Sequence, residues 1–257
     1  MKVVLLAGGF GTRIAEESHL RPKPMIEIGG KPILWHIMKS YAAHGFHEFI
    51  ICCGYKAEVI KRYFADYFLH QCDVTFDYRD GNSMEIHTSA AEPWKVTLID
   101  TGLHTMTGGR IRRIREYTEN QPFMVTYGDG VSDVDIQKLL AFHQEKGKLA
   151  TITVVQPEGR FGMADIEEDE ITAFREKSAV DMGWINGGFM VLEPQVFEYI
   201  GGDESIFERE PLKNLARERQ LAAYKHTGFW QCMDTQRDKA HLEQLWETGG
   251  APWKLWN

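Results

Sequence analysis

The chain begins with an apolar stretch of strand length that runs straight into glycines. Residues 1–7 read MKVVLLA, and residues 8–13 read GGFGTR. Glycines allow backbone N–H groups to approach an anion without interference from side chains. The planar guanidinium group of Arg13 presents donors that match phosphate oxygens. This pattern predicts a phosphate-binding loop at the carboxyl end of the first strand.

The loop matches neither of two common nucleotide-binding motifs. Its glycines lack the G-x-G-x-x-G spacing of dinucleotide sites, and the G-x-x-x-x-G-K-[ST] sequence of a P-loop is absent. Residues 21–24 read RPKP, and prolines on both sides of Lys23 fix the local backbone and exclude a helix. A solvated loop lysine is the simpler interpretation of Lys23. Its position shortly after Arg13 favours convergence of the two side chains on one anion.

Composition narrows the class of protein. The chain has 257 residues and a net charge of −8, which argues against a nucleic-acid scaffold. No apolar run approaches the roughly 20 residues of a membrane span, and the start lacks the basic segment of a signal peptide. The four cysteines have neither zinc spacing nor a disulfide pattern, and Cys52 and Cys53 lie in an apolar run that predicts core thiols. We therefore expect a cytoplasmic protein that contacts neither nucleic acid nor a membrane.

Predicted strands and helices alternate through the first half of the chain. Strands are expected at 2–7, 49–53, 122–127 and 150–155, and helices at 32–45, 57–68, 109–118 and 135–147. This order predicts an α/β fold of the Rossmann-like kind, with a mostly parallel central sheet covered by helices on both faces. Residues 73–100, with short strands at 74–78, 85–87 and 96–99, are interpreted as a small β insertion over one side of the sheet. Later strands are expected at 163–166, 171–174, 189–192 and 221–225, and later helices at 211–219 and 236–247.

Two carboxylates follow predicted strands. Asp129 lies between two glycines after the apolar strand 122–127, at the end where ligands bind in parallel sheets. A carboxylate beside a phosphate site requires a cation between them, and Mg²⁺ is commonly held by one or two carboxylates plus substrate phosphates. Asp234, before the last helix, is a second candidate ligand. The alternatives are a turn residue for Asp129 and a helix N-cap for Asp234, with Thr235 as the next choice for the cap.

Two further segments carry polar residues suited to phosphates and hydroxyl groups. Lys177 could hold a sugar phosphate while Glu176 and Asn186 contact hydroxyl groups, although a surface Glu-Lys pair is the common alternative. Residues 107–110 read TGGR and open a helix whose N-terminus could contact a nucleotide. The three later arginines of that helix fit a solvated face.

Together these segments resemble the sugar-1-phosphate nucleotidylyltransferases. The matching pieces are LAGGFGTR at 6–13, RPKP at 21–24, YGDG at 127–130, FREK at 174–177, INGG at 185–188 and FWQCMDT at 229–235, in the order that the family has them. The segments 34–41, 49–56, 97–102, 106–110 and 251–254 are similar to the members that use CTP and glucose 1-phosphate. Ser178 departs from the family, which often has proline there, and a ligand contact of His104 does not follow from the relatives.

The resemblance implies transfer of CMP from CTP to α-D-glucose 1-phosphate by a Mg²⁺-dependent in-line displacement that gives CDP-glucose and pyrophosphate. It implies catalytic roles for Arg13, Lys23 and Asp129, and Mg²⁺ ligation by Asp129 and Asp234. The implied substrate-binding residues are Leu6, Ala7, Gly8, Gly9, Phe10, Gly11, Thr12, Arg13, Lys23, Thr107, Gly109, Gly128, Glu176, Lys177 and Asn186. It also implies a homo-oligomer of one domain, with residues 1–155 mainly nucleotide-binding and a C-terminal lobe, residues 156–257, mainly sugar-phosphate-binding.

Two alternatives remain open at this point. A uridylyl- or thymidylyltransferase could use the same fold, because backbone groups can distinguish the N4 donor of cytosine from the O4 acceptor of uracil. A non-catalytic nucleotide-binding regulatory protein is the other. The presence of Arg13, Lys23, Asp129 and Asp234 together argues against it.

Overall fold

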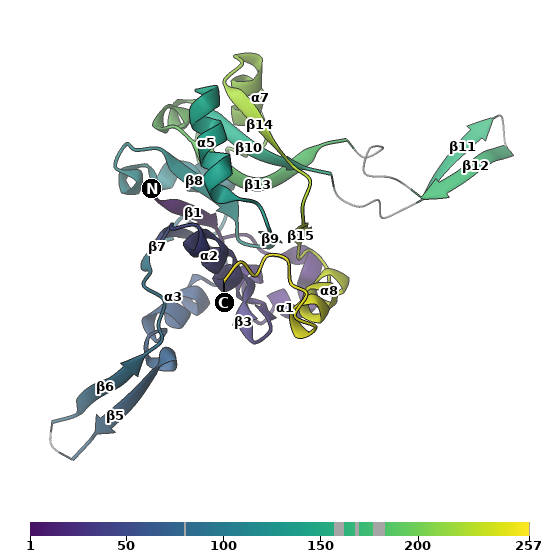
Figure 1. Cartoon of the computed structure of the whole chain (residues 1–257). Coiled ribbons are helices and arrows are strands. Elements are labelled where there is room, and N and C mark those ends of the chain that lie inside the picture. The colour runs from purple at the N-terminus through teal and green to yellow at the C-terminus, as the bar shows by residue number, and fades with distance from the viewer. Residues whose placement is uncertain (80, 157–161, 168–169, 177–182, 257) are drawn as a thin grey trace.

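The computed structural model, which describes residues 1–79, 81–156, 162–167, 170–176 and 183–256, is built around one seven-stranded sheet (Figure 1). The order is β14 (Leu221–His226), β10 (Ala150–Val155), β13 (Ile185–Leu192), β8 (Phe123–Tyr127), β1 (Val3–Leu6), β4 (Glu48–Cys53) and β7 (Lys95–Asp100). Within this sheet β13 runs antiparallel to both β10 and β8, and the remaining neighbours pair in parallel. The expected α/β fold with a mostly parallel sheet is confirmed.

Helices cover both faces of the sheet. Val3 and Leu5 of β1 pack with α2 (Ile33–Ala43), α3 (Ala57–Ala65), α5 (Ile136–Lys146) and α8 (Gln236–Glu247). Val4 faces the other way, towards α4 (Thr107–Arg113), α7 (Glu210–Arg217) and the 3-10 helix η5 (Pro194–Tyr199). This alternation follows from the two-residue period of a strand. Within the described ranges, no helix has the length and apolar character needed to cross a membrane.

Short elements connect the larger ones in the described part of the chain. They are η1 (Thr12–Ile14), α1 (Ala15–Ser18), η2 (Lys23–Met25), β2 (Glu27–Ile28), β3 (Lys31–Pro32), η3 (Leu69–Gln71), η4 (Arg115–Thr118), β9 (Gly130–Ser132) and β15 (Trp230–Cys232). The predicted strands at 163–166 and 171–174 are found as β11 (Gly162–Glu167) and β12 (Glu170–Glu176), which pair with each other in a separate two-stranded sheet.

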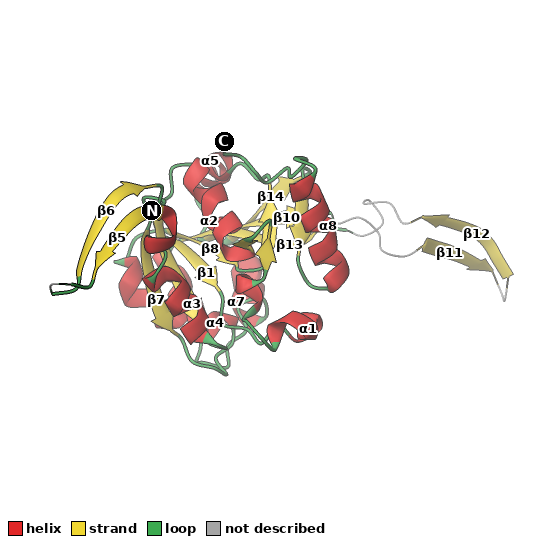
Figure 2. Ribbon diagram, turned by 90° about the horizontal axis from the view of Figure 1, so that it is seen from below, coloured by secondary structure: helices red, strands yellow, loops and turns green. Residues whose placement is uncertain are grey.

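The predicted insertion at 73–100 was wrong in two respects. β5 (Cys72–Asp77) and β6 (Ser83–Ser89) form an antiparallel hairpin that projects away from the sheet and does not cover it (Figures 1 and 2). The strand expected at 96–99 is part of β7, which pairs in parallel with β4 at the edge of the central sheet. Val96 and Leu98 pack on one face and Ile99 on the other. A short apolar run does not reveal which sheet it joins. The sequence therefore could not distinguish a strand of the insertion from an edge strand of the central sheet.

The two adjacent cysteines are core thiols, as predicted. Cys52 and Cys53 lie in β4 and are buried, with neither side chain in a disulfide. Burial raises the pKa of Cys53 to about 11 and raises the pKa of Cys52 further. Both groups therefore stay protonated at neutral pH and are poor nucleophiles.

A buried histidine links α2 to the C-terminal segment. His36 is fully buried against Trp246 and Trp253. Its Nε2 lies 2.8 Å from the carbonyl oxygen of Ile28, and Trp253 donates from Nε1 to its Nδ1 at 3.4 Å. These partners satisfy the neutral ring. A proton on Nδ1 would face a donor, and burial, the main cause, lowers the pKa of His36 to about 4.

We expect His36 to make the protein less stable in mild acid. The unfolded chain takes up a proton near pH 6.5, whereas the folded chain does so near pH 4. The stabilising contribution is therefore complete above pH 6.5 and is lost as the pH falls towards 4. Between about pH 7.5 and 5 the loss should be about 2 kcal/mol in the free energy of unfolding.

Urea unfolding of wild type and His36→Gln at the two pH values measures this contribution. Glutamine can keep one donor and one acceptor but does not titrate in this range. The fall in unfolding free energy should be about 2 kcal/mol smaller in the variant. An equal fall in both proteins would mean that another group senses the acid.

Candidate active site

A cavity of about 490 Å³ opens at the carboxyl ends of β1 and β8. These strands are neighbours, with Leu6 opposite Tyr127, so the loops that follow them meet. The residues lining the cavity are Leu6, Ala7, Gly8, Gly9, Phe10, Gly11, Thr12, Arg13, Lys23, Pro24, Leu103, His104, Thr105, Met106, Thr107, Arg110, Tyr127, Gly128 and Asp129. The predicted glycine loop, Lys23, Thr107, Gly128 and Asp129 therefore share one cavity.

Arg110 holds the strand ends behind the glycine loop. Its side chain is buried, and it donates to the carbonyl oxygens of Gly8 at 3.0 Å and Cys53 at 3.1 Å. It also donates to Thr101 Oγ1 at 2.7 Å. A Cβ atom on Gly8 would lie 2.1 Å from Arg110 Nη1, so glycine is required there by close approach as well as by the phosphate-loop pattern. The arginine thus ties the ends of β1, β4 and β7 together.

Lys23 lies between the two candidate metal ligands. Its Nζ donates to Asp129 Oδ2 and to Asp234 Oδ1, each at 2.5 Å. Burial lowers the pKa of Lys23, but the charges and hydrogen bonds of Asp129 and Asp234 outweigh burial and hold it above the usual range. Burial raises the pKa of Asp234, but Lys23 and then Arg13 outweigh it and hold that pKa low. At neutral pH Lys23 and Asp234 therefore form a charged ion pair.

The prolines around Lys23 set its direction. Pro22 is extended, with φ −66° and ψ 147°, and the next three residues form the 3-10 helix η2. The prolines thus exclude an α-helix, as expected, but one tight helical turn forms where none was predicted. Met25 donates to the Pro22 carbonyl oxygen at 2.8 Å and closes this turn. Lys23 is 9% exposed, so it is not a solvated loop lysine.

Two short strands bring the carboxylates together from distant parts of the sequence. β9 follows Asp129 and pairs antiparallel with β15, with Gly130 opposite Cys232. The backbone N–H of Met233 then donates to the carbonyl oxygen of Asp129 at 2.8 Å. Asp234, one residue later, is therefore held beside Asp129.

Thr235, not Asp234, caps α8. The Thr235 side chain accepts from the backbone N–H of Asp238, and the Asp238 side chain accepts from the backbone N–H of Thr235 in return. This reciprocal capping box leaves the Asp234 carboxylate free to face Lys23 and Arg13. The alternative that Asp234 serves as the N-cap was wrong.

The donor set fits a hard divalent cation. The two carboxylate oxygens lie within reach of one ammonium group, so their separation cannot exceed the sum of its two 2.5 Å contacts. That range includes the spacing of two oxygens bound to one Mg²⁺ at about 2.0–2.1 Å. In the described part of the chain, no group of three or more His, Cys, Asp or Glu side chains could hold a metal. The protein would supply two ligands and leave the remaining positions for water and phosphate oxygens.

A family model described as nucleotidyl transferase matches residues 2–237. The chain belongs to the nucleotidyl transferase family. The resemblance found in its motifs is thereby confirmed.

This nucleotidyl transferase has close full-length relatives. It is 56% identical to the glucose-1-phosphate cytidylyltransferase of Salmonella typhi and 44% identical to the probable glucose-1-phosphate cytidylyltransferase of Bacillus subtilis, over 257 residues and 100% of both chains in each case. A crystal structure of HddC from Yersinia pseudotuberculosis has a TM-score of 0.69 at 25% identity, covering 95% of this chain and 99% of that chain. A UDP-glucose pyrophosphorylase in complex with UDP-glucose has a TM-score of 0.69 at 17% identity, covering 96% and 98%, and shares the fold.

Some predicted residues of the transferase lie elsewhere. Gly109 does not line the cavity, and a Cβ atom there would lie 2.6 Å from the carbonyl oxygen of Asp203. Glycine at this position allows the backbone to pack closely against the loop at Asp203. Lys177 lies outside the described residues, as does Ser178. Glu176 ends β12, and its side chain is outside what the structure describes.

The structure adds to the site two residues to which the sequence assigned no role, Tyr127 and His104. Tyr127 lines the cavity, and its hydroxyl accepts from Asn186 Nδ2 at 3.1 Å, which brings Asn186 to the edge of the site. His104 also lines the cavity, with its ring centre 6.0 Å from that of Phe10. Tyr127 could have been found, because it directly precedes the glycine before Asp129 on a predicted strand. His104 carries no comparable signal.

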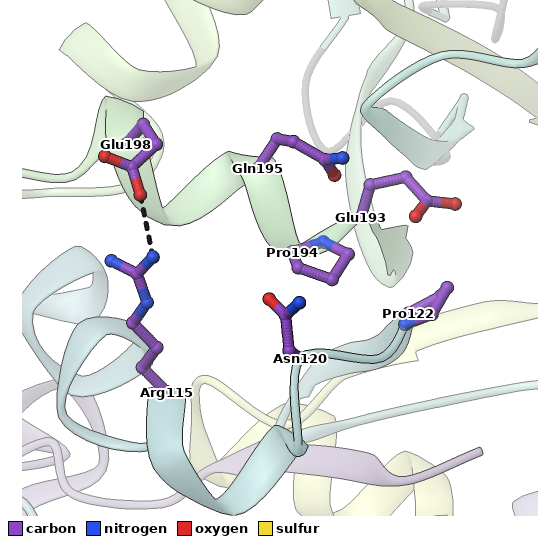
Figure 3. A pocket seen from close by; sticks show the side chains of 7 residues that line it. All are labelled: Arg115, Asn120, Pro122, Glu193, Pro194, Gln195 and Glu198. Carbon is purple, nitrogen blue, oxygen red and sulfur yellow. Dashed lines mark hydrogen bonds and ion pairs between the residues drawn. The ribbon is translucent and has the colours of Figure 1, made fainter.

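Another, smaller groove of about 270 Å³ lies at the opposite ends of the central strands, where β8 begins and β13 ends. Figure 3 shows the side chains that line it. Its lining includes Pro122 before β8, and Glu193, which follows the antiparallel strand β13. An Arg115–Glu198 ion pair at 2.8 Å closes one side. The groove contains none of the predicted site residues. In parallel sheets ligands bind at the carboxyl ends of the strands, where the larger cavity lies.

Proposed function

We propose that the chain transfers CMP from CTP to α-D-glucose 1-phosphate and releases pyrophosphate, giving CDP-glucose. One observation carries the proposal: Lys23 and Asp129 line a cavity large enough for a small ligand beside a glycine loop, and Asp234, outside the lining, pairs with the same lysine. The names of the relatives that match over the full chain supply the base and the sugar.

The proposed reaction is an in-line displacement at the α-phosphorus of CTP. A phosphate oxygen of glucose 1-phosphate forms the new P–O bond, and the bond to the β-phosphate breaks with its electrons going to pyrophosphate. The protein needs no covalent nucleophile and acts by positioning and charge stabilisation. This agrees with the unreactive thiols of β4.

Each charged side chain then has a role. Lys23 neutralises the charge that builds at the α-phosphate, and Arg13, at the exposed side of the cluster, binds the triphosphate end. Asp129 and Asp234 would hold Mg²⁺, which when bound would offset the charge between phosphates and carboxylates. Lys177, Glu176 and Asn186 are assigned to the sugar phosphate.

We also propose how the chain is divided between its two substrates and how it assembles. Residues 1–155 would mainly bind nucleotide, and residues 156–257 would mainly bind the sugar phosphate. The protein would act as a cytoplasmic homo-oligomer whose partners are its two small-molecule substrates.

The choice of base is testable with CTP and UTP. A pocket that accepts a hydrogen bond from cytosine N4 leaves two acceptors facing each other when uracil enters. Such a mismatch costs about 1–3 kcal/mol, so kcat/KM with glucose 1-phosphate should favour CTP by about one to two orders of magnitude.

A pyrophosphate-release assay with CTP, UTP, dTTP and GTP measures this preference in the presence of Mg²⁺. Equal kcat/KM for CTP and UTP would contradict a cytidylyltransferase. Turnover with another nucleotide alone would assign a different base, and no turnover with any of them would favour a regulatory protein.

A further inference from the structure

The loop between η5 and α7 packs directly under the N-terminus of α4. The carbonyl oxygen of Asp203 accepts from Met106 N at 2.8 Å, and that of Ser205 accepts from Gly109 N at 3.2 Å. The glycine at 109 allows this approach, since any Cβ would collide with Asp203. The loop thereby brings Glu208 into contact with Thr107 and Tyr127, which line the cavity.

Glu208 accepts hydrogen bonds from two residues that line the cavity. The Thr107 hydroxyl donates to Oε2 at 2.6 Å, and the Tyr127 hydroxyl donates to Oε1 at 2.5 Å. Phe207 N donates to Thr107 Oγ1 at 2.9 Å, so the single proton of Thr107 is free to point at Glu208. One carboxylate therefore joins the start of α4 to the end of β8.

These bonds fix which way the Tyr127 proton points. A phenol has one proton to donate, and Glu208 takes it, while Asn186 donates to the same oxygen. The Tyr127 oxygen is left with one lone pair and no proton for a ligand.

Hydrogen bonds also fix the orientation of the Asn186 amide. Its Oδ1 accepts from Gly188 N at 2.9 Å, and one proton of Nδ2 goes to Tyr127. The second Nδ2 proton is left for a ligand. The pair thus offers one acceptor and one donor, a combination that suits sugar hydroxyl groups.

We infer that Glu208 is a positioning residue for sugar recognition, which takes the Tyr127 proton so that the Tyr127 oxygen accepts a hydrogen bond from a hydroxyl group of the hexose. This rests on the proposed function. A purely structural role for Glu208, bracing α4 against β8, is the competing explanation.

Calorimetric titration with CDP-glucose and with CDP separates the two explanations without turnover. Glu208→Ala frees the Tyr127 proton to point at the ligand, so CDP-glucose should bind about 10-fold more weakly, as expected for one misdirected hydrogen bond. CDP, which lacks the hexose, should change less than about 2-fold. Glu210→Ala is the matched control, because Glu210 lies nearby on the surface and pairs with Lys213 at 3.3 Å.

Further variants test the route through Tyr127. In a Tyr127→Phe background, Glu208→Ala should weaken CDP-glucose binding no further. Glu208→Gln should retain binding within about 3-fold, because its amide oxygen can still accept the Tyr127 proton. Glu208→Met, which keeps the length without an acceptor, replaces Glu208→Ala if circular dichroism shows that the alanine variant is unfolded.

Equal losses for CDP and CDP-glucose, or a full additional loss in the Tyr127→Phe background, would overturn the inference. The inference would also be overturned if the wild-type protein bound CDP-glucose no more tightly than CDP. A separate assay tests the proposed function itself. If it is wrong, wild type will release no pyrophosphate from CTP and glucose 1-phosphate.

Discussion

Replacing Asp129 with asparagine is expected to lower kcat by about three orders of magnitude or more. The amide is a weak ligand for Mg²⁺, and the charge stabilisation that a metal supplies is worth several kcal/mol in the transition state. Lys23 keeps its second partner, Asp234, so the fold should survive. Steady-state pyrophosphate release over a Mg²⁺ titration, with thermal unfolding in parallel, measures both effects.

Asp100→Asn is the matched control for this variant. Asp100 also ends a strand of the central sheet, but it lies outside the cavity lining and accepts from the backbone N–H of Gly102 at 3.0 Å. Its turnover should stay close to that of wild type. Wild-type Mg²⁺ dependence in Asp129→Asn would remove Asp129 from the site.

Replacing Lys23 with alanine should lower kcat by about two to three orders of magnitude, with a smaller change in the KM for CTP. Loss of one preorganised charge at the reacting group typically costs this much. The substitution also leaves Asp129 and Asp234 facing each other without the cation between them. Full kinetics against both substrates separates a loss in kcat from a loss in binding.

Lys56→Ala controls for the removal of a lysine near the site. Lys56 donates to the carbonyl oxygen of His19 at 2.5 Å and lies outside the cavity lining. A Lys23→Ala enzyme with unchanged kcat and a raised KM for CTP would assign Lys23 to ground-state binding and contradict its role at the α-phosphate.

The local parts of the site could be predicted because their signals are local. A strand that ends in glycines, followed by arginine, predicts the loop that lines the cavity, and an aspartate between two glycines after an apolar strand predicts the position of Asp129. The parallel sheet then brings these loops together, as β1 and β8 do. The ends of α5 could also be predicted from the sequence, because Asp135 caps its start and Gly147 adopts a left-handed conformation at its end.

Other features depend on contacts between distant parts of the chain. Arg110 belongs to the TGGR segment, which predicted a helix start that contacts a nucleotide. Its burial instead depends on carbonyl groups from β4 and from the loops after β1 and β7. Gly109 matched a nucleotide-binding pattern, but its packing partner is a loop about 90 residues later. The sequence of the helix alone contains no information about either partner. The same holds for β7, whose place in the central sheet depends on pairing with β4.

The central claim is tested most directly by following the two labelled phosphates. Glucose 1-phosphate radiolabelled at its phosphate and CTP radiolabelled at its γ-phosphate are each incubated with the protein, Mg²⁺ and the unlabelled second substrate. Transfer of CMP predicts that the sugar phosphate label appears in CDP-glucose and the γ label in pyrophosphate. A sugar phosphate label that is released as free phosphate or pyrophosphate, or that stays in glucose 1-phosphate while CTP is consumed, would contradict the proposed reaction.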